Sequence, residues 1–144
     1  ASALYASENV VLILLGGTVR RNSPDLSGPL AEANAKSFRT HLAVVGADAV
    51  TPEGAFTTDV GVARVSQALA ANAKETVLAV DSGKFMQTAL VRHLGYPQIH
   101  RIVTDDGCPA SVREWLDRAG PAVAYVPFSK TPSRRARQAP EGAE

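Results

Sequence analysis

The sequence predicts a layered α/β domain with a mostly parallel sheet. Three observations support this prediction: five short apolar segments are rich in β-branched residues, three segments between them have helical periodicity, and the two kinds alternate along the chain. With 144 residues, of which 45% are hydrophobic and 20% charged, the chain can bury one substantial core. We therefore expect a single folded domain.

The five predicted strands are almost continuously apolar, a pattern typical of parallel strands that are buried on both faces of a sheet. They are residues 10–15, 42–46, 76–81, 100–104 and 122–126. Because each is followed by a polar or helical stretch, consecutive strands can run in the same direction with a helix crossing over between them.

The three predicted helices cover residues 30–38, 60–72 and 109–119. In the second, apolar residues recur at spacings of three and four, so that they share one face. The third has Pro109 at a first helical position and Gly120 just after its end. The alternation predicts a Rossmann-like domain with a sheet of about five strands flanked by helices.

The composition changes near the end of the chain. Residues 128–144 are rich in Pro, Ser and Arg without apolar periodicity, and we expect a flexible basic tail there. Residues 1–127 are expected to form the folded domain. The tail holds four basic and two acidic residues, so a total formal charge of +1 leaves about −1 on the domain. Such a body is a poor candidate for binding nucleic-acid phosphates.

Cysteine content and hydropathy restrict the cellular setting. Cys108 is the only cysteine, which excludes an internal disulfide and a cysteine-based zinc site and suits a reducing cytoplasm. The longest apolar run, residues 10–15, is far too short to span a membrane. The first residues lack a basic start followed by an apolar stretch, so we expect no signal peptide, no membrane partner and a cytoplasmic location.

Small and polar residues follow the predicted strands, at the edge of a parallel sheet where ligands bind. Gly16 and Gly17 follow the first strand, with Arg20 shortly after them. This glycine pair either lets the backbone approach a ligand or forms a simple turn. Asp48 follows the second strand, where it orients a sugar hydroxyl, acts as a base, or caps the following turn.

Two further candidates lie downstream. Lys84, in "DSGKF" after the third strand, either meets a phosphate or carboxylate as a point charge or pairs with Asp81 or Asp48. Residues 53–58 are predicted as a loop before a helix, in which Thr57 either caps that helix or reaches the ligand. An anionic small molecule is therefore a plausible ligand.

No combination of residues predicts catalysis. There is no nucleophile elbow, Walker loop or dinucleotide fingerprint, and the histidines lack the spacing of metal ligands. Asp105 and Asp106, followed by a glycine, are more typical of a loop and helix cap than of a cation site. We expect no catalytic residue, no metal and no cofactor.

The order of seven motifs adds a family resemblance. The segments "LLGGTVRR", "SGPLAE", "VVGADAV", "GAFTTD", "VLAVDSGKF", "ALVR" and "IVTDDG" resemble the effector-binding half of DeoR-type bacterial transcriptional regulators, from about residue 10 to residue 126. The resemblance implies a fold related to ribose-5-phosphate isomerase. It also implies a repressor of sugar or nucleoside catabolism that a phosphorylated sugar releases from DNA.

The same resemblance implies roles for individual residues. Gly16 and Gly17 would border the ligand pocket, and Lys84 matches the lysine that related enzymes place near the sugar phosphate. Asp48 lies where the isomerases keep a catalytic acid, but Ala49 replaces the second acid of their motif. Losing that carboxylate weakens the case for proton transfer, so binding without catalysis is expected.

Two parts of the family pattern do not occur in this sequence: the winged helix-turn-helix and an Asp-x-Gly-Thr-Thr-like phosphate loop. We therefore expect a chain that starts inside the sensor domain and reaches DNA only through a helix-turn-helix domain outside it. Its sheet would then have an unpaired edge, which favours a homo-oligomer. The alternatives are a sugar-phosphate isomerase that uses Asp48 and Lys84, and a purely oligomerising module.

Overall fold

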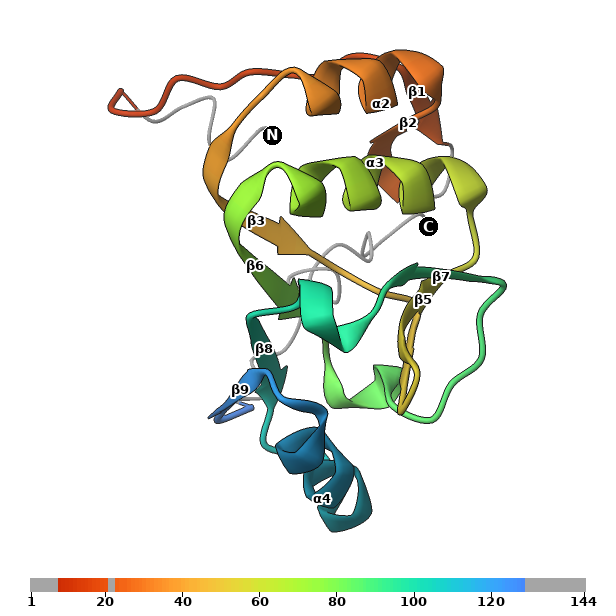
Figure 1. Cartoon of the computed structure of the whole chain (residues 1–144), viewed down its shortest axis with the longest axis vertical. Helices are drawn as coiled ribbons and strands as arrows, with labels where there is room; N and C mark the ends of the chain where they lie inside the picture. The colour runs from red at the N-terminus through yellow and green to blue at the C-terminus, as the bar shows by residue number, and fades with distance from the viewer. Residues whose placement is uncertain (1–7, 21–22, 129–144) are drawn as a thin grey trace, which may run out of the picture.

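The computed structural model describes residues 8–20 and 23–128, which form an α/β domain (Figure 1). Its main sheet has four parallel strands in the order β3-β6-β8-β9. They are β3 (Thr40–Val45), β6 (Ala73–Ala79), β8 (Arg101–Asp105) and β9 (Ala122–Val126). The predicted fold class is confirmed, and four of the five predicted strands correspond to members of this sheet. The predicted tail lies outside the described residues, apart from residue 128.

Three helices occur where helical periodicity predicts them. They are α2 (Pro29–Lys36), α3 (Val60–Ala71) and α4 (Ala110–Ala119). Helices α2 and α3 lie side by side at one end of the molecule, and α4 lies at the opposite end next to β9 (Figure 1). Helix α3 is capped at its N-terminus by Asp59, whose Oδ1 accepts a hydrogen bond from the backbone N–H of Val62 at 2.8 Å.

The core lies between the main sheet, α4 and the segments that connect them. Leu78 of β6 and Ile102 of β8 are paired neighbours, and both are fully buried together with Leu116 of α4. Trp115 packs beside them, with its ring centroid 6.1 Å from that of Phe85. Removing these large side chains from water is the main stabilising contribution.

Five short strands form two additional antiparallel sheets that the sequence analysis did not anticipate. They are a hairpin of β1 (Thr18–Arg20) and β2 (Ser23–Ser27), and a sheet of β4 (Ala49–Thr51), β5 (Gly54–Thr57) and β7 (Val91–Leu94) in the order β4-β5-β7. The loop predicted for residues 53–58 is therefore wrong over β5. Strands of three to five residues are too short for their alternation to stand out, and their stability comes from pairing.

Two 3-10 helices complete the described chain, and both occur in connections between strands. They are η1 (Ser82–Lys84), which follows β6, and η2 (Tyr96–Gln98), which follows β7. The first of them holds the lysine of the predicted site.

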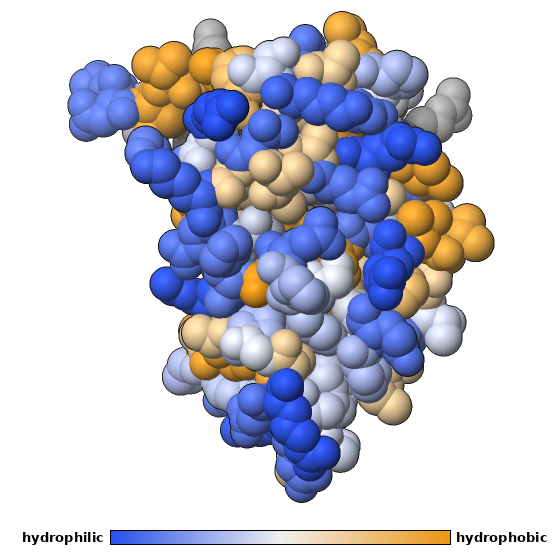
Figure 2. Space-filling view, viewed as in Figure 1, coloured by the Kyte–Doolittle hydropathy of each residue, from blue (hydrophilic) through white to orange (hydrophobic). Residues whose placement is uncertain are grey.

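The predicted strand at residues 10–15 is wrong. This segment is not a strand, and Val11, Ile13 and Leu14 are 90%, 62% and 62% exposed. Figure 2 shows hydrophobic side chains gathered at the end of the molecule where this segment runs. An apolar, β-branched run predicts a buried strand, but a strand also needs a neighbour to receive its backbone hydrogen bonds. Among the described strands of the main sheet, none pairs with it.

The prediction that the strands are buried on both faces of the sheet is also wrong for β3. Ala43 and Val45 face the core, whereas the alternate residues Leu42 and Val44 are 50% and 62% exposed. Among the described residues, β3 pairs on one side only, with β6. Strand β3 therefore has an open edge and an exposed apolar face.

Candidate functional site

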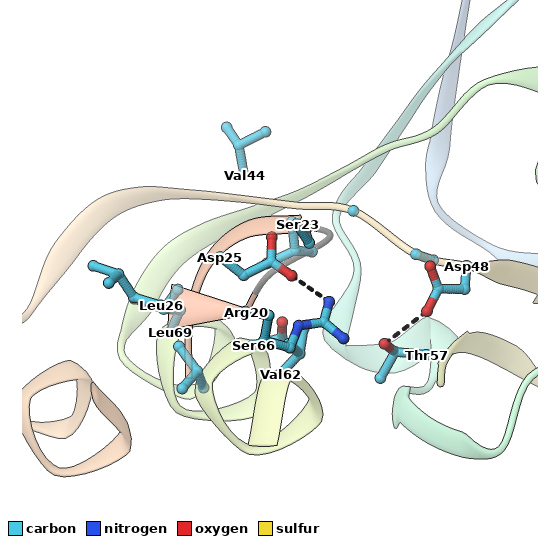
Figure 3. A pocket seen from close by; sticks show the side chains of 14 residues that line it. Arg20, Ser23, Asp25, Leu26, Val44, Asp48, Thr57, Val62, Ser66 and Leu69 are labelled. Carbon is cyan, nitrogen blue, oxygen red and sulfur yellow. Dashed lines mark hydrogen bonds and ion pairs between the residues drawn. The ribbon is translucent and has the colours of Figure 1, made fainter. Parts of the chain in front are cut away.

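A cavity of about 360 Å³ lies beside the carboxyl end of β3 (Figure 3). Its walls are the β1–β2 hairpin, the end of β3 with the loop that follows it, and one side of α3. The polar part of the lining comes from Arg20, Ser23, Asp25, Asp48, Thr57 and Ser66. This is the edge of the sheet at which α/β domains bind ligands, because strand ends and helix N-termini meet there.

Asp48 is anchored at this cavity through one carboxylate oxygen. Its Oδ2 accepts hydrogen bonds from the Thr58 backbone N–H at 2.7 Å and from the Thr57 and Thr58 hydroxyls at 2.9 Å each. These bonds, above all the one from the Thr58 backbone, and the charge of nearby Lys84 hold the pKa of Asp48 below its usual range. The ionised group keeps a second oxygen, Oδ1, that can accept a hydrogen bond from a ligand hydroxyl.

Thr57 lies at the end of β5 and is almost fully buried. Its hydroxyl donates to Asp48, while the carboxylate that caps α3 belongs to Asp59. Of the two roles expected for Thr57, helix capping is thus taken by a neighbouring residue. Thr57 lines the cavity next to Asp48, and its contact with a ligand stays a prediction.

Lys84 ends η1 and does not line the cavity. The start of η1 is held in place by Asp81, which caps it, and by Asp105, whose Oδ2 accepts from the Ser82 backbone N–H at 2.6 Å. Because the positive charge of Lys84 favours the ionised form of Asp48, the two groups belong to one electrostatic environment. A β-bridge between Val50 and Phe85 joins the two segments that carry these residues, which are far apart in sequence.

Gly16 and Gly17 precede the β1–β2 hairpin and are not part of the cavity lining. Both have positive φ angles, +73° and +102°. A Cβ atom on Gly17 would lie 2.5 Å from the Ser27 carbonyl oxygen and 3.0 Å from the Ala31 Cβ. Close packing of hairpin and helix therefore requires glycine at position 17, and a ligand contact of this pair stays a prediction.

Arg20 lines the cavity, although its sequence position after Gly16 and Gly17 did not predict a role at the site. Its Nη2 lies 2.5 Å from Oδ2 of Asp25, and its Nη1 lies 3.4 Å from Oδ2 of Asp59. These carboxylates, led by the hydrogen bond to Asp25, raise the pKa of Arg20. The pKa of Asp25 is lowered by hydrogen bonds from Ser23 and then from Arg20. The sequence signal was weak because Arg20 and its nearer partner, Asp25, lie in a hairpin that the sequence did not predict.

His93 of β7 supports the loop that carries Asp48. It is 2% exposed, and its Nε2 lies 3.1 Å from the carbonyl oxygen of Gly46, at the end of β3. Because a carbonyl oxygen only accepts, Nε2 carries the proton and donates. Burial lowers the pKa of His93, which favours this neutral form. The histidine thus links the small antiparallel sheet to the segment that carries Asp48.

Within residues 8–20 and 23–128, no group of three or more His, Cys, Asp and Glu side chains is arranged to hold a metal ion. The helices in the described part of the chain are all too short or too polar to cross a bilayer. The polar groups that line the cavity are carboxylates, hydroxyls and the guanidinium of Arg20, and Lys84 acts on Asp48 through its charge.

Comparison with known proteins identifies the family. The DeoR C-terminal sensor domain matches residues 1–106. The chain is 32% identical to the putative aga operon transcriptional repressor of Escherichia coli O157:H7 over 127 residues. This aligned region makes up 88% of this chain and 47% of that protein. The chain is 31% identical over 111 residues to the HTH-type transcriptional regulator GlpR of Haloferax volcanii, covering 76% of this chain and 44% of the relative.

A third relative is the glycerol-3-phosphate regulon repressor of Escherichia coli K12, 26% identical over 117 residues, or 81% of this chain and 46% of that protein. The chain spans about half the length of these curated relatives. They are regulators of transcription and not enzymes, so the expectation of a non-enzyme is confirmed and the isomerase alternative is dropped.

The family match covers more than half of the chain, and the α/β fold and the order of the sequence motifs agree with it. The chain belongs to the family of DeoR C-terminal sensor domains.

Proposed function

We propose that this chain is the effector-sensing domain of a DeoR-family repressor of sugar or nucleoside catabolism genes, and that its effector is a phosphorylated sugar. The observation that carries the proposal is Asp48, an ionised carboxylate on the cavity that is anchored through Oδ2 alone. The name of one relative, the glycerol-3-phosphate regulon repressor, supports a phosphorylated polyol-like effector.

The composition of the cavity suits such a molecule. Sugar hydroxyls donate to a carboxylate such as Asp48, and a sugar ring also has apolar C–H faces that can pack against Val62 and Leu69 of α3. The cavity of about 360 Å³ is within the usual size range of small-ligand sites. A phosphate requires a compensating positive charge, which Lys84 supplies close to Asp48.

We assign five residues to the proposed effector site. Asp48 accepts from sugar hydroxyls, Thr57 keeps that carboxylate oriented, and Lys84 attracts the phosphate. Gly16 and Gly17 border the site through the packing of the β1–β2 hairpin. The site is proposed to bind without catalysing a reaction, since Ala49 offers no second carboxylate next to Asp48.

Regulation would follow from thermodynamic linkage between the effector site and the DNA-binding site. DNA is proposed to contact a helix-turn-helix domain absent from this chain, in a protein that acts in the cytoplasm. An effector that binds one conformation of the sensor more tightly than another changes DNA affinity, and DNA changes effector affinity by the same factor. The proposal therefore requires effector binding and DNA binding to be reciprocal.

Isothermal titration of this chain with ribose 5-phosphate, glucose 6-phosphate and glycerol 3-phosphate, each beside its neutral parent compound, tests the proposal. We expect one phosphorylated compound to bind and its neutral parent to bind at least about tenfold more weakly, because the phosphate loses its charge-assisted bonds. The same compound should change the DNA affinity of a protein that joins this domain to its helix-turn-helix. No binding across the panel, with DNA affinity unaffected, would contradict the proposal.

A second candidate function is assembly of the chain with a copy of itself. It is supported by the open edge of β3 and by the exposure of Leu42 and Val44 on that strand. Light scattering of this chain across a concentration series tests it. A monomer at all concentrations would remove this candidate without affecting effector binding.

A further inference from the structure

Arg20 is the one cationic side chain in the cavity lining formed by the described residues. It comes from β1, and its guanidinium group lies between the β2 hairpin strand and the start of α3 (Figure 3). Its partners are Asp25 at 2.5 Å and Asp59 at 3.4 Å. A cation on the cavity surface can bind an anionic group of a ligand if one of these two carboxylates first releases its contact with the guanidinium.

The two carboxylates differ in the other contacts that hold them. Asp59 caps α3, because its Oδ1 accepts from the Val62 backbone N–H at 2.8 Å, and its Oδ2 lies at a longer distance from Arg20. Asp25 holds Nη2 of Arg20 with Oδ2 alone, and both side chains are about one third exposed, at 33% and 35%. Ion pairs with this much contact with water are weak and exchange readily.

The guanidinium also has unused hydrogen-bonding capacity. Nη2 and Nε lie on the same edge of this planar group, the edge that carboxylates and phosphates bind with two parallel hydrogen bonds. Asp25 occupies Nη2, while Nε of Arg20 is buried with no hydrogen-bond partner among the described residues. A buried donor without a partner is unfavourable, so an acceptor that satisfies both positions is favoured over one that satisfies a single position.

We infer that Arg20 receives the phosphate of the effector on its Nε–Nη2 edge and that Asp25 is the counter-ion which the phosphate replaces. This inference rests on the proposed function and deepens it, since it adds Arg20 and Asp25 to the effector site. Asp25 sets the selectivity: a phosphate dianion offers two oxygens and more charge than the carboxylate it displaces, whereas a neutral sugar cannot displace it.

Three variants of this chain test the inference in isothermal titrations with ribose 5-phosphate, glucose 6-phosphate and glycerol 3-phosphate. Arg20→Gln should weaken binding of the phosphorylated compound by at least about tenfold, because it removes the charge-assisted bonds. Asp25→Asn should tighten binding by about threefold to tenfold, because it removes the competing partner of Arg20. Arg118→Gln, on the exposed last turn of α4, is the matched control and should leave the dissociation constant unchanged.

The opposite signs separate this role from a structural one. If Arg20 and Asp25 only hold the hairpin together, both substitutions loosen the same contact and both weaken binding, which would overturn the inference. Unchanged binding in both variants would also overturn it, while leaving the proposed function intact. Should wild-type chain bind none of the three phosphates, the proposed function and this inference fail together. Asp25→Asn nearly preserves side-chain shape, so its result counts even if Arg20→Gln does not fold.

Discussion

Asp48 and Arg20 face the same cavity but are held in different ways. Asp48 is fixed by three donors that converge on a single oxygen, all from the end of β5 and the residue after it. Arg20 is held by carboxylates, one of which also caps a helix. Neutral donors that surround a carboxylate orient it without cancelling its charge. At the scale of single residues, the site therefore combines a fixed acceptor with an exchangeable cation.

The substitution Asp48→Asn is expected to lower the free energy of unfolding by about 1 kcal/mol at pH 7, since an amide cannot match a carboxylate as acceptor for these donors. The folded-state pKa of Asp48 is lowered. Its contribution is therefore present above the unfolded pKa of about 3.9 and is lost as pH falls through the lower folded value. Urea unfolding at pH 7 and pH 3 measures the difference between variant and wild type.

That difference should be smaller at pH 3 than at pH 7, because the stabilisation is already declining below the unfolded pKa. The control is Asp117→Asn on the exposed side of α4, which should change stability little at either pH. A pH-independent loss in Asp48→Asn would mean that the side chain matters through packing instead of charge.

Helix α3 is the element that connects the site to the rest of the fold. Its N-terminus follows the Asp48-binding segment directly, and its apolar side forms one wall of the cavity. Asp59 gives this helix a defined start, because its carboxylate satisfies a backbone N–H that has no partner within the helix. A weakened start would disturb both the Asp48 network and the Arg20 contact.

Replacement of Asp59 by alanine is expected to cost about 1 kcal/mol of stability through loss of the cap, whereas Asp59→Ser should cost much less because serine also caps helices. Urea denaturation, followed by circular dichroism, measures both. Equal losses in the two variants would show that the charge of Asp59, through Arg20, matters more than the cap.

The small antiparallel sheet depends on a close backbone contact between β5 and β7. Gly54 has a φ of +135°, and a Cβ there would lie 2.3 Å from the carbonyl oxygen of Leu94. Gly54→Ala should therefore destabilise the chain by more than about 2 kcal/mol, from backbone strain and overpacking together.

Gly120 provides the matched control. Its φ is +104°, but a Cβ would meet nothing within 4 Å. Gly120→Ala should thus cost about 1 kcal/mol from strain alone. Chemical denaturation of both variants checks the difference, and similar losses at the two positions would refute the close contact as its cause.

Viewed as a whole, the molecule buries one face of its main sheet better than the other. Leu42 and Val44 on β3 and Val126 on β9 are about half exposed or more. Parallel sheets are usually covered on both faces, so apolar side chains in this position favour association with a second surface.

The substitution Leu42→Lys is expected to weaken self-association of this chain at least about tenfold, because a buried leucine contributes about 1.5–3 kcal/mol. Light scattering over a concentration series measures the effect. Leu90→Lys is the comparison, since Leu90 is 77% exposed but lies in the connection between η1 and β7. If Leu90→Lys disrupts association and Leu42→Lys does not, the contact surface is elsewhere.

The elements that the sequence predicted are those whose signal is local. The apolar run of β9 and the helical spacing of α3 are properties of five to twelve consecutive residues. Periodicity of this kind reflects which face an element buries, whatever its partner is. The family resemblance was likewise available from the order of short motifs along the chain.

The site could be predicted only in part. Asp48 and Lys84 were predicted because both follow apolar strands, and parallel strands end at a common edge. Of the two, Asp48 lines the cavity. Two contacts could not be predicted: the hydrogen bond between Asp48 and Thr57, and the ion pair between Arg20 and Asp25. The first depends on a small sheet and the second on a hairpin, and both are built from very short strands.

By itself the sequence determined the alternation of strands and helices, the family and the two strand-end residues Asp48 and Lys84. Only the tertiary structure decided that residues 10–15 are not a strand and that Arg20 faces the cavity. The physical reason is that the periodicity of burial depends on residues that are neighbours in the sequence. Strand pairing and ion pairing depend instead on which distant segments meet in the fold.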